Sequence, residues 1–138
     1  MATLTDWTSR AQQSDRIWVA RSETFVDPDD GYYAVIKVPT KALITQVWIH
    51  IATAFTAAGA ILTVGFEGNG DTAVTNCFFT TDIAKPTETG IKRSFPDVAV
   101  SVEGKWFDTY RGVITITTDD QGGTAGTFTV FAEFAEIF

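Results

Sequence analysis

Short runs in which apolar and polar residues alternate recur along most of the chain, separated by Gly, Pro, Asn and Asp. Clear examples are QVWIHIA, AILTVGF, VAVSVE and GTFTVFAEF, which are rich in β-branched and aromatic residues. A period of two places alternate side chains on opposite faces of a β-strand. About eight such runs at regular spacing, without a convincing long helix, predict an all-β sandwich or barrel.

Long connections between the runs and a strand at the end of the sequence favour a jelly-roll-like antiparallel β-sandwich. An immunoglobulin-like sandwich is the alternative. The alternation also sorts the side chains by face. Three groups are each predicted to share one face of a strand: Val47, Ile49 and Ile51; Leu62, Val64 and Phe66; and Phe128, Val130, Ala132 and Phe134.

With 138 residues, of which 45% are hydrophobic and 13% aromatic, the chain has the size and composition of one folded domain. Residues 1–22 differ from the rest, because they are polar and charged and lack a period of two. The stretch SRAQQSDR fits either a short helix with Ser9 as its N-cap or an extended arm. We therefore predict an extended or partly helical N-terminal arm at residues 1–22 and a β-sandwich domain at residues 23–138.

The formal net charge of −7 and the pI near 4.5 describe an acidic surface, which makes nucleic acid and anionic membranes poor partners. The longest uncharged apolar stretch is interrupted by Gln46, His50 and several threonines, so no membrane span is expected. The single cysteine, Cys77, excludes an internal disulfide and a Cys-based zinc site. The first residues hold no apolar core of signal-peptide length, and we expect synthesis in a cytoplasm without secretory export.

The stretch GFEGNGDT, residues 65–72, raises the question of a phosphate loop, a calcium loop or a turn. Its glycines lack the spacing of a dinucleotide fingerprint, and the β-branched residues that follow are poor helix formers. An EF-hand loop starting at Glu67 would need Gly and an acid where Thr72 and Phe78 stand. A looser calcium site, shared with Asp27, Asp29 or Asp30, stays open. A turn between two strands explains every residue and is our interpretation.

The sequence offers little for catalysis. The only histidine, His50, lies in the middle of a predicted strand, and neither a G-x-S-x-G elbow nor a motif around Cys77 supplies a nucleophile. One histidine and one cysteine also do not make a transition-metal site. Carboxylate pairs such as those at residues 29–30 and 119–120 stand beside glycines, where acids commonly serve turns. We expect no enzymatic activity, no cofactor and no metal.

Exposed aromatic side chains bind sugars by stacking, and the stretch GKWFDTYRG is the most suggestive group, with Trp106, Phe107 and Tyr110. The competing interpretation is that aromatic side chains fill the core or an interface between subunits. The remaining candidates for stacking are Trp7, Trp18, Trp48, Tyr32 and Tyr33.

Two long segments resemble small β-sandwich proteins in the virions of tailed bacteriophages. The run GVITITTDDQGGTAGTFTVFAEFAEI resembles their closing two strands, which are a Thr-rich strand, a Gly-rich turn and a strand like FTVFAEF. The run ITQVWIHIATAFTAAGAILTVGFEGNGDT is similar to their central hairpin. The resemblance extends from Ala42 onward, and residues 1–22 match nothing in it.

The resemblance implies a structural virion protein of the head decoration or cement type. Such a protein is non-enzymatic and trimeric, assembles in the host cytoplasm, and binds the major capsid protein on the outside of the capsid lattice. Because aromatic and Arg side chains dominate interface energetics, we expect the capsid or inter-subunit contacts at Trp7, Arg10, Arg16 and Trp18.

Two other functions stay open at this stage. One is a carbohydrate-binding or receptor-binding module of a phage head fibre or tail, with Trp106 and Tyr110 as its sugar platform. The other is a small hydrolase on a β-sandwich, for which the sequence assigns neither a nucleophile nor an acid pair.

Overall fold

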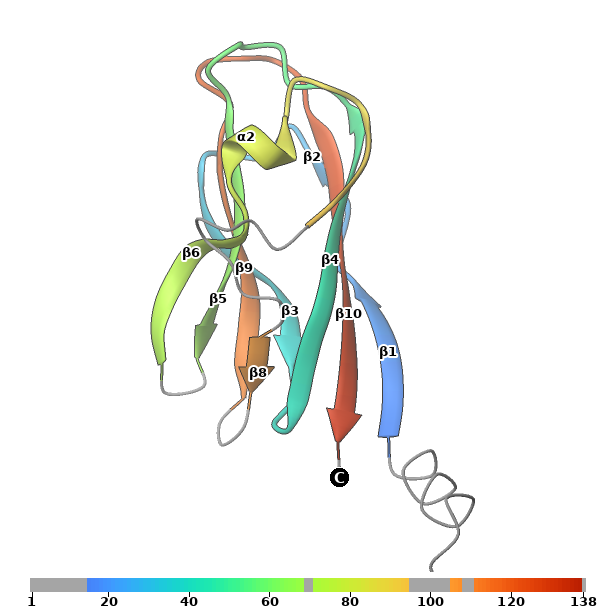
Figure 1. The fold of residues 1–138 in the computed structure, drawn as a ribbon. Helices are drawn as coiled ribbons and strands as arrows, with labels where there is room; N and C mark the ends of the chain where they lie inside the picture. Colours follow the sequence, from blue (N-terminus) through green and yellow to red (C-terminus); the bar gives the residue numbers. More distant parts are fainter. Residues whose placement is uncertain (1–14, 69–70, 95–104, 108–110, 138) are drawn as a thin grey trace, which may run out of the picture.

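The structure of the chain, a computed structural model, describes residues 15–68, 71–94, 105–107 and 111–137. These residues form ten strands and one helix of four residues (Figure 1). In chain order the elements are β1 (Asp15–Arg21), β2 (Phe25–Val26), β3 (Gly31–Val38), β4 (Ala42–Thr53), β5 (Ile61–Gly68), β6 (Asp71–Phe79), α2 (Thr81–Ala84), β7 (Gly90–Arg93), β8 (Lys105–Phe107), β9 (Gly112–Asp119) and β10 (Thr127–Ile137).

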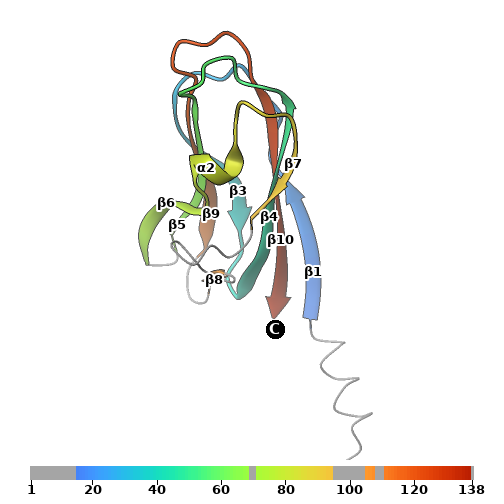
Figure 2. The same cartoon turned by 45° about the horizontal axis from the view of Figure 1, so that its top comes forward.

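Two antiparallel sheets make up the molecule, and Figures 1 and 2 show them packed face to face. The first sheet has the strand order β1-β10-β4-β7, with β2 paired to β10 and β8 paired to β4. The second has the order β3-β9-β5-β6. If the short β2 and β8 are set aside and the others are lettered B to I, these orders read B-I-D-G and C-H-E-F. That is the topology of a jelly roll, so the predicted fold is confirmed and the immunoglobulin-like alternative is not.

The core lies between the sheets and is filled by the faces that the alternation predicts. All ten side chains of the three predicted groups are buried, from Val47 in β4 to Phe134 in β10. Phe66 of β5 and Phe107 of β8 join the two layers, since their rings meet edge-on at a centroid distance of 5.9 Å. Within the first sheet, Phe25 stacks on its register partner Phe128 at 5.1 Å. The contact between two such rings adds to the stabilisation that comes from burying their apolar surface.

The interpretation of GFEGNGDT as a turn is confirmed by the pairing of the strands on either side. β5 and β6 pair antiparallel, with Gly68 opposite Asp71, so the chain reverses direction between these two strands. Farther along the hairpin the register is irregular. Between the pairs Val64–Phe79 and Phe66–Val74, β6 covers five residue steps where β5 covers two. β6 therefore bulges across β5 at Gly65, where an added Cβ would lie only 1.9 Å from the carbonyl oxygen of Val74.

The segment IAKPTETGIKRSFP, residues 83–96, is rich in turn formers, yet part of it is regular. The helix α2 ends within it at Ala84, and β7 pairs with β4 through Ile91 opposite His50. The predicted strand VAVSVE lies outside the described residues. No helix in the described part of the chain is long and apolar enough to cross a membrane.

Candidate interaction surface

The predicted contact residues fall on or before the first strand. Trp7 and Arg10 lie outside the described residues. Arg16 and Trp18 lie in β1, where they are opposite Glu136 and Phe134 of β10. The structure thus places part of the predicted arm, Asp15–Arg21, as a strand of the first sheet.

Trp18 has a defined environment at this edge. Its ring is 46% exposed, and its indole Nε1 donates a hydrogen bond to Glu136 Oε2 at 3.1 Å. The neighbouring side chains are more exposed, with Ile17 at 72% and Val19 at 63%. Three consecutive large apolar side chains at the edge of a sheet leave both faces of that edge uncovered. Exposed apolar strand edges of this kind are sites of association.

The outer face of the first sheet continues the apolar surface inward from β1. Residues directly opposite in an antiparallel pair share a face, so the row Arg21, Phe131, Trp48, Arg93 crosses four strands on one side. An open groove of about 340 Å³ lies along this face. It is lined by Val19, Trp48, His50, Ile91 and Phe131.

His50 lies on this outer face, as the alternation of its strand predicts, and it is exposed. Its register neighbours are Thr129 and Ile91. The residues that line the groove include neither an acid nor a nucleophile, so the groove suits an apolar contact and not acid–base catalysis.

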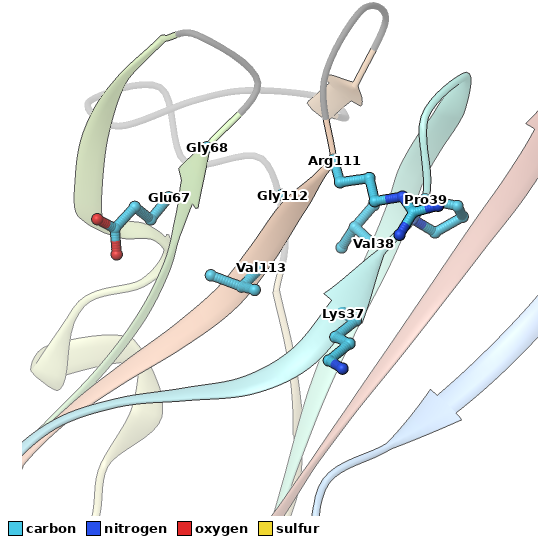
Figure 3. A pocket seen from close by; sticks show the side chains of 8 residues that line it. All are labelled: Lys37, Val38, Pro39, Glu67, Gly68, Arg111, Gly112 and Val113. Carbon is cyan, nitrogen blue, oxygen red and sulfur yellow. The ribbon is translucent and has the colours of Figure 1, made fainter.

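A second hollow, of about 530 Å³, lies on the second sheet where β3 and β5 end and β9 begins (Figure 3). Lys37 and Glu67 both pair in register with Val113, and Figure 3 shows their charged ends on opposite sides of it. Arg111 and Pro39 also line the hollow. The lining residues hold no histidine, cysteine or serine, so they offer no nucleophile with an adjacent base.

Three acids meet at the opposite end of the sandwich. Carboxylate oxygens of Asp30, Asp119 and Asp120 lie within 4.8 Å of one another. Each also accepts a backbone hydrogen bond in the turn: Asp30 Oδ1 from Asp120 N at 3.0 Å, Asp119 Oδ1 from Gln121 N at 2.8 Å, and Asp120 Oδ1 from Gly122 N at 3.0 Å. This is the turn role predicted for the pair at residues 119–120.

The looser calcium site, in which Asp30 or its neighbours would join the GNGD turn, is not formed. Ile61 pairs with Asp119 at one end of β5, and Gly68 pairs with Gly112 at the other. The full eight-residue length of β5 separates the two turns, which is roughly 25 Å at the usual rise per residue. Acids that far apart do not share one ion.

The suggested sugar-stacking group is also divided by the fold. Phe107 is fully buried and packs in the core against Phe66. Trp106 pairs in register with Leu43, while Tyr110 lies outside the described residues. The other tyrosines are bound in place, since Tyr32 Oη donates to Glu67 Oε2 at 3.2 Å and Tyr33 Oη to the Asp29 carbonyl at 2.7 Å.

Comparison with known proteins finds similar structures but no similar sequences. No known protein family matches the sequence, and no curated protein matches it in sequence. Solved structures do match. A chain in the acid-stable capsid of Helicobacter pylori bacteriophage KHP30 has a TM-score of 0.60 and 16% identity, and the match covers 86% of each chain.

Two other phage capsids contain a similar chain. For the capsid of cyanophage Pam1 the TM-score is 0.62 with 11% identity, over 89% of this chain and 86% of that one. For the capsid of Ralstonia phage GP4 it is 0.57 with 14% identity, over 91% and 86%. At these identities the likeness establishes the fold. The neighbours are phage capsid components with a jelly-roll-like fold, in agreement with the resemblance seen in the sequence.

Proposed function

We propose that this chain is a structural protein of a phage virion, of the capsid decoration or cement type. One observation carries the proposal: three phage capsids each contain a chain that matches nearly the whole of this one, with 86% of that chain covered in every case. The coverage is similar on both sides, so the matched chains are close to this one in length. The match is therefore to a small, single-sandwich component of a capsid.

The described surface suits such a role. The hollows hold no recognisable catalytic group, and we propose that the protein is not an enzyme. An exposed apolar strand edge continues into an apolar outer face, and an apolar surface of this kind is suited to contact with other proteins. In the proposed virion the partners are the major capsid protein and two further copies in a trimer. Trp7, Arg10, Arg16 and Trp18 supply contacts to one or the other.

Reconstitution on particles tests the proposal. Empty capsids of the phage that carries this gene, purified from an infection with the gene deleted, are mixed with the purified protein and pelleted. We expect saturable binding and a higher temperature of capsid rupture in the presence of the protein. Binding that stays unchanged when all four contact residues are replaced by Ala would remove those residues from the interface. Absence of any binding would refute the decoration function.

The alternative function is a carbohydrate-binding or receptor-binding module of a head fibre or tail. Burial of Phe107 removes one member of its suggested stacking group, which leaves Trp106 and Tyr110. A glycan array that gives reproducible hits, lost in Trp106→Ala, would favour this alternative over decoration.

A further inference from the structure

β1 leaves one edge unpaired among the described residues, because it is the terminal strand of the first sheet and only β10 lies beside it. Natural sheet edges are usually blunted by Lys, Pro, a bulge or a covering loop. The centre of β1 has none of these and instead carries Ile17, Trp18 and Val19, which are 72%, 46% and 63% exposed. A strand edge of this kind is suited to pairing with another strand.

We infer that β1 pairs antiparallel with β1 of a second copy of this chain, about a two-fold axis that passes beside Trp18. The sequence of the strand, DRIWVAR, is complementary to itself in this arrangement. Asp15 lies opposite Arg21 of the second copy, Ile17 opposite Val19, and Trp18 opposite the same residue. Every residue of β1 then has a partner, and the two ends join opposite charges.

The register follows from the geometry of the sheet. If the two copies keep their cores on the same side, the two-fold axis is normal to the sheet, and paired residues must share a face. Only registers centred on Ile17, Trp18 or Val19 keep the apolar centre of the strand paired. Centring on Ile17 places Asp15 opposite Val19, and centring on Val19 places Ile17 opposite Arg21. Centring on Trp18 avoids both mismatches.

The two faces of the joined strands agree with this register. Ile17 and Val19 share the outer face with Ala135 and Glu133 of β10, so each apolar side chain covers the other across the axis. Trp18 lies on the inner face with Phe134. Its indole N–H already has a partner in Glu136 Oε2, so the two rings meet with their polar group satisfied.

Charge favours a second copy as the occupant. The chain as a whole carries a net charge of −7, so two copies repel at most of their surface. Within β1 the order of the charges is complementary to itself, with an acid at the start of the strand and an arginine at its end. In the antiparallel pair Asp15 of each copy lies opposite Arg21 of the other. A strand from a different protein would have to reproduce this order of an acid, an apolar centre and a base by chance.

The pairing does not depend on the proposed function. It joins copies in twos through β1, which takes up Arg16 and Trp18, whereas the decoration proposal gathers copies in threes, and its contacts then come from Trp7 and Arg10. If both hold, paired β1 strands link neighbouring trimers across two-fold axes.

Disulfide trapping tests the register. Residues directly opposite have Cα atoms about 4.5–5.5 Å apart, within disulfide range, while diagonal neighbours are about 7–8 Å apart. We expect Trp18→Cys to form a covalent dimer on oxidation. Ile17→Cys alone and Val19→Cys alone should crosslink poorly, but an equimolar mixture of these two variants should crosslink well. The wild type is the control for Cys77, which is buried. Equal crosslinking in all samples, or none in any, overturns the register.

Mass in solution tests whether the pairing forms without trapping. By light scattering at micromolar concentration, we expect an even number of copies for the full chain. The double substitution Ile17→Lys and Val19→Lys places two pairs of ammonium groups opposite each other, one pair on each side of the axis, and should halve that mass. The matched control is Val26→Lys, at a side chain that is 70% exposed on β2.

Three results overturn the inference. The first is a monomer or trimer for the full chain, and the second is an unchanged mass for the double variant. The third is an equal loss of mass in Ile91→Lys, at a side chain 73% exposed on the far strand β7, which would assign the contact to the outer face. Failure of capsid binding leaves these masses unaffected, so the two proposals fail separately.

Discussion

Replacing Gly65 by Ala tests the closest backbone contact in the second sheet. An ideal Cβ at this position would lie 1.9 Å from the carbonyl oxygen of Val74 and 2.5 Å from the carbonyl carbon of Thr75. Carbon and oxygen atoms normally approach no closer than about 3.3 Å. The backbone of β6 therefore has to move away from β5 by more than an ångström, and no side-chain rotation relieves the clash.

The cost follows from what this movement breaks. Overpacking in a buried site destabilises by about 1–3 kcal/mol. The register pair Phe66–Val74 lies next to the clash, and weakening its backbone hydrogen bonds costs about 1 kcal/mol each. We therefore expect Gly65→Ala to lower the free energy of unfolding by about 3 kcal/mol. For a domain of this size that corresponds to a fall in Tm of about 10 °C.

Thermal and urea unfolding, followed by circular dichroism, measure this change. The matched control is Gly59→Ala, where the added Cβ would meet only Gln121 Cγ at 3.7 Å, an ordinary contact. The control should unfold within about 2 °C of the wild type. If Gly65→Ala also unfolds within that range, β6 does not cross β5 as closely as described, and the reasoning is refuted.

Three further substitutions probe other features of the fold. Phe107→Ala removes a fully buried ring from the core and should lower the free energy of unfolding, measured by urea unfolding, by about 3–5 kcal/mol. A decrease below about 1 kcal/mol would contradict the packing of Phe107 against Phe66. Thr115→Val removes a buried hydroxyl that has no hydrogen-bond partner among the described residues. The free energy of unfolding should rise by about 1 kcal/mol, whereas a fall would show that the hydroxyl is bonded. Burial lowers the pKa of Lys92 in the folded protein below its usual 10.5. At a pH between the folded and the unfolded pKa, the unfolded chain binds more protons, so the free energy of unfolding rises with pH. Lys92→Met should flatten that rise in urea titrations at alkaline pH, and an unchanged slope would assign the rise to other groups.

The sequence predicts the parts of this fold where alternation is strict. In β4, β5 and β10 one face is buried against the opposite sheet, so apolar residues must recur at every second position. The sequence also predicts the turn at residues 65–72, because glycines and acids follow directly after a run that alternates as a strand does. These elements determine most of both sheets, and they are sufficient to favour a jelly roll.

The elements that were missed have no such pattern. β1 has apolar side chains on both faces at its centre, since an edge strand outside the core need not alternate. β7 is only four residues long, and it exists because β4 offers a free edge, which is a tertiary effect. The candidate interaction surface depends on both strands. It therefore became visible only when the register placed Val19, Phe131, Trp48 and Ile91 on one face.

The position of β10 sets the order in which this protein folds during synthesis. β10 follows every other strand in the chain, yet it lies between β1 and β4 and pairs with both along most of its length. A ribosome adds about 5–20 residues per second, so β1 and β4 wait several seconds for the strand that joins them. During that time the first sheet lacks its centre, and the apolar faces of both strands are open to chaperones and proteases. A nascent chain that stops before Thr127 should be degraded rather than stored as a partly folded sandwich.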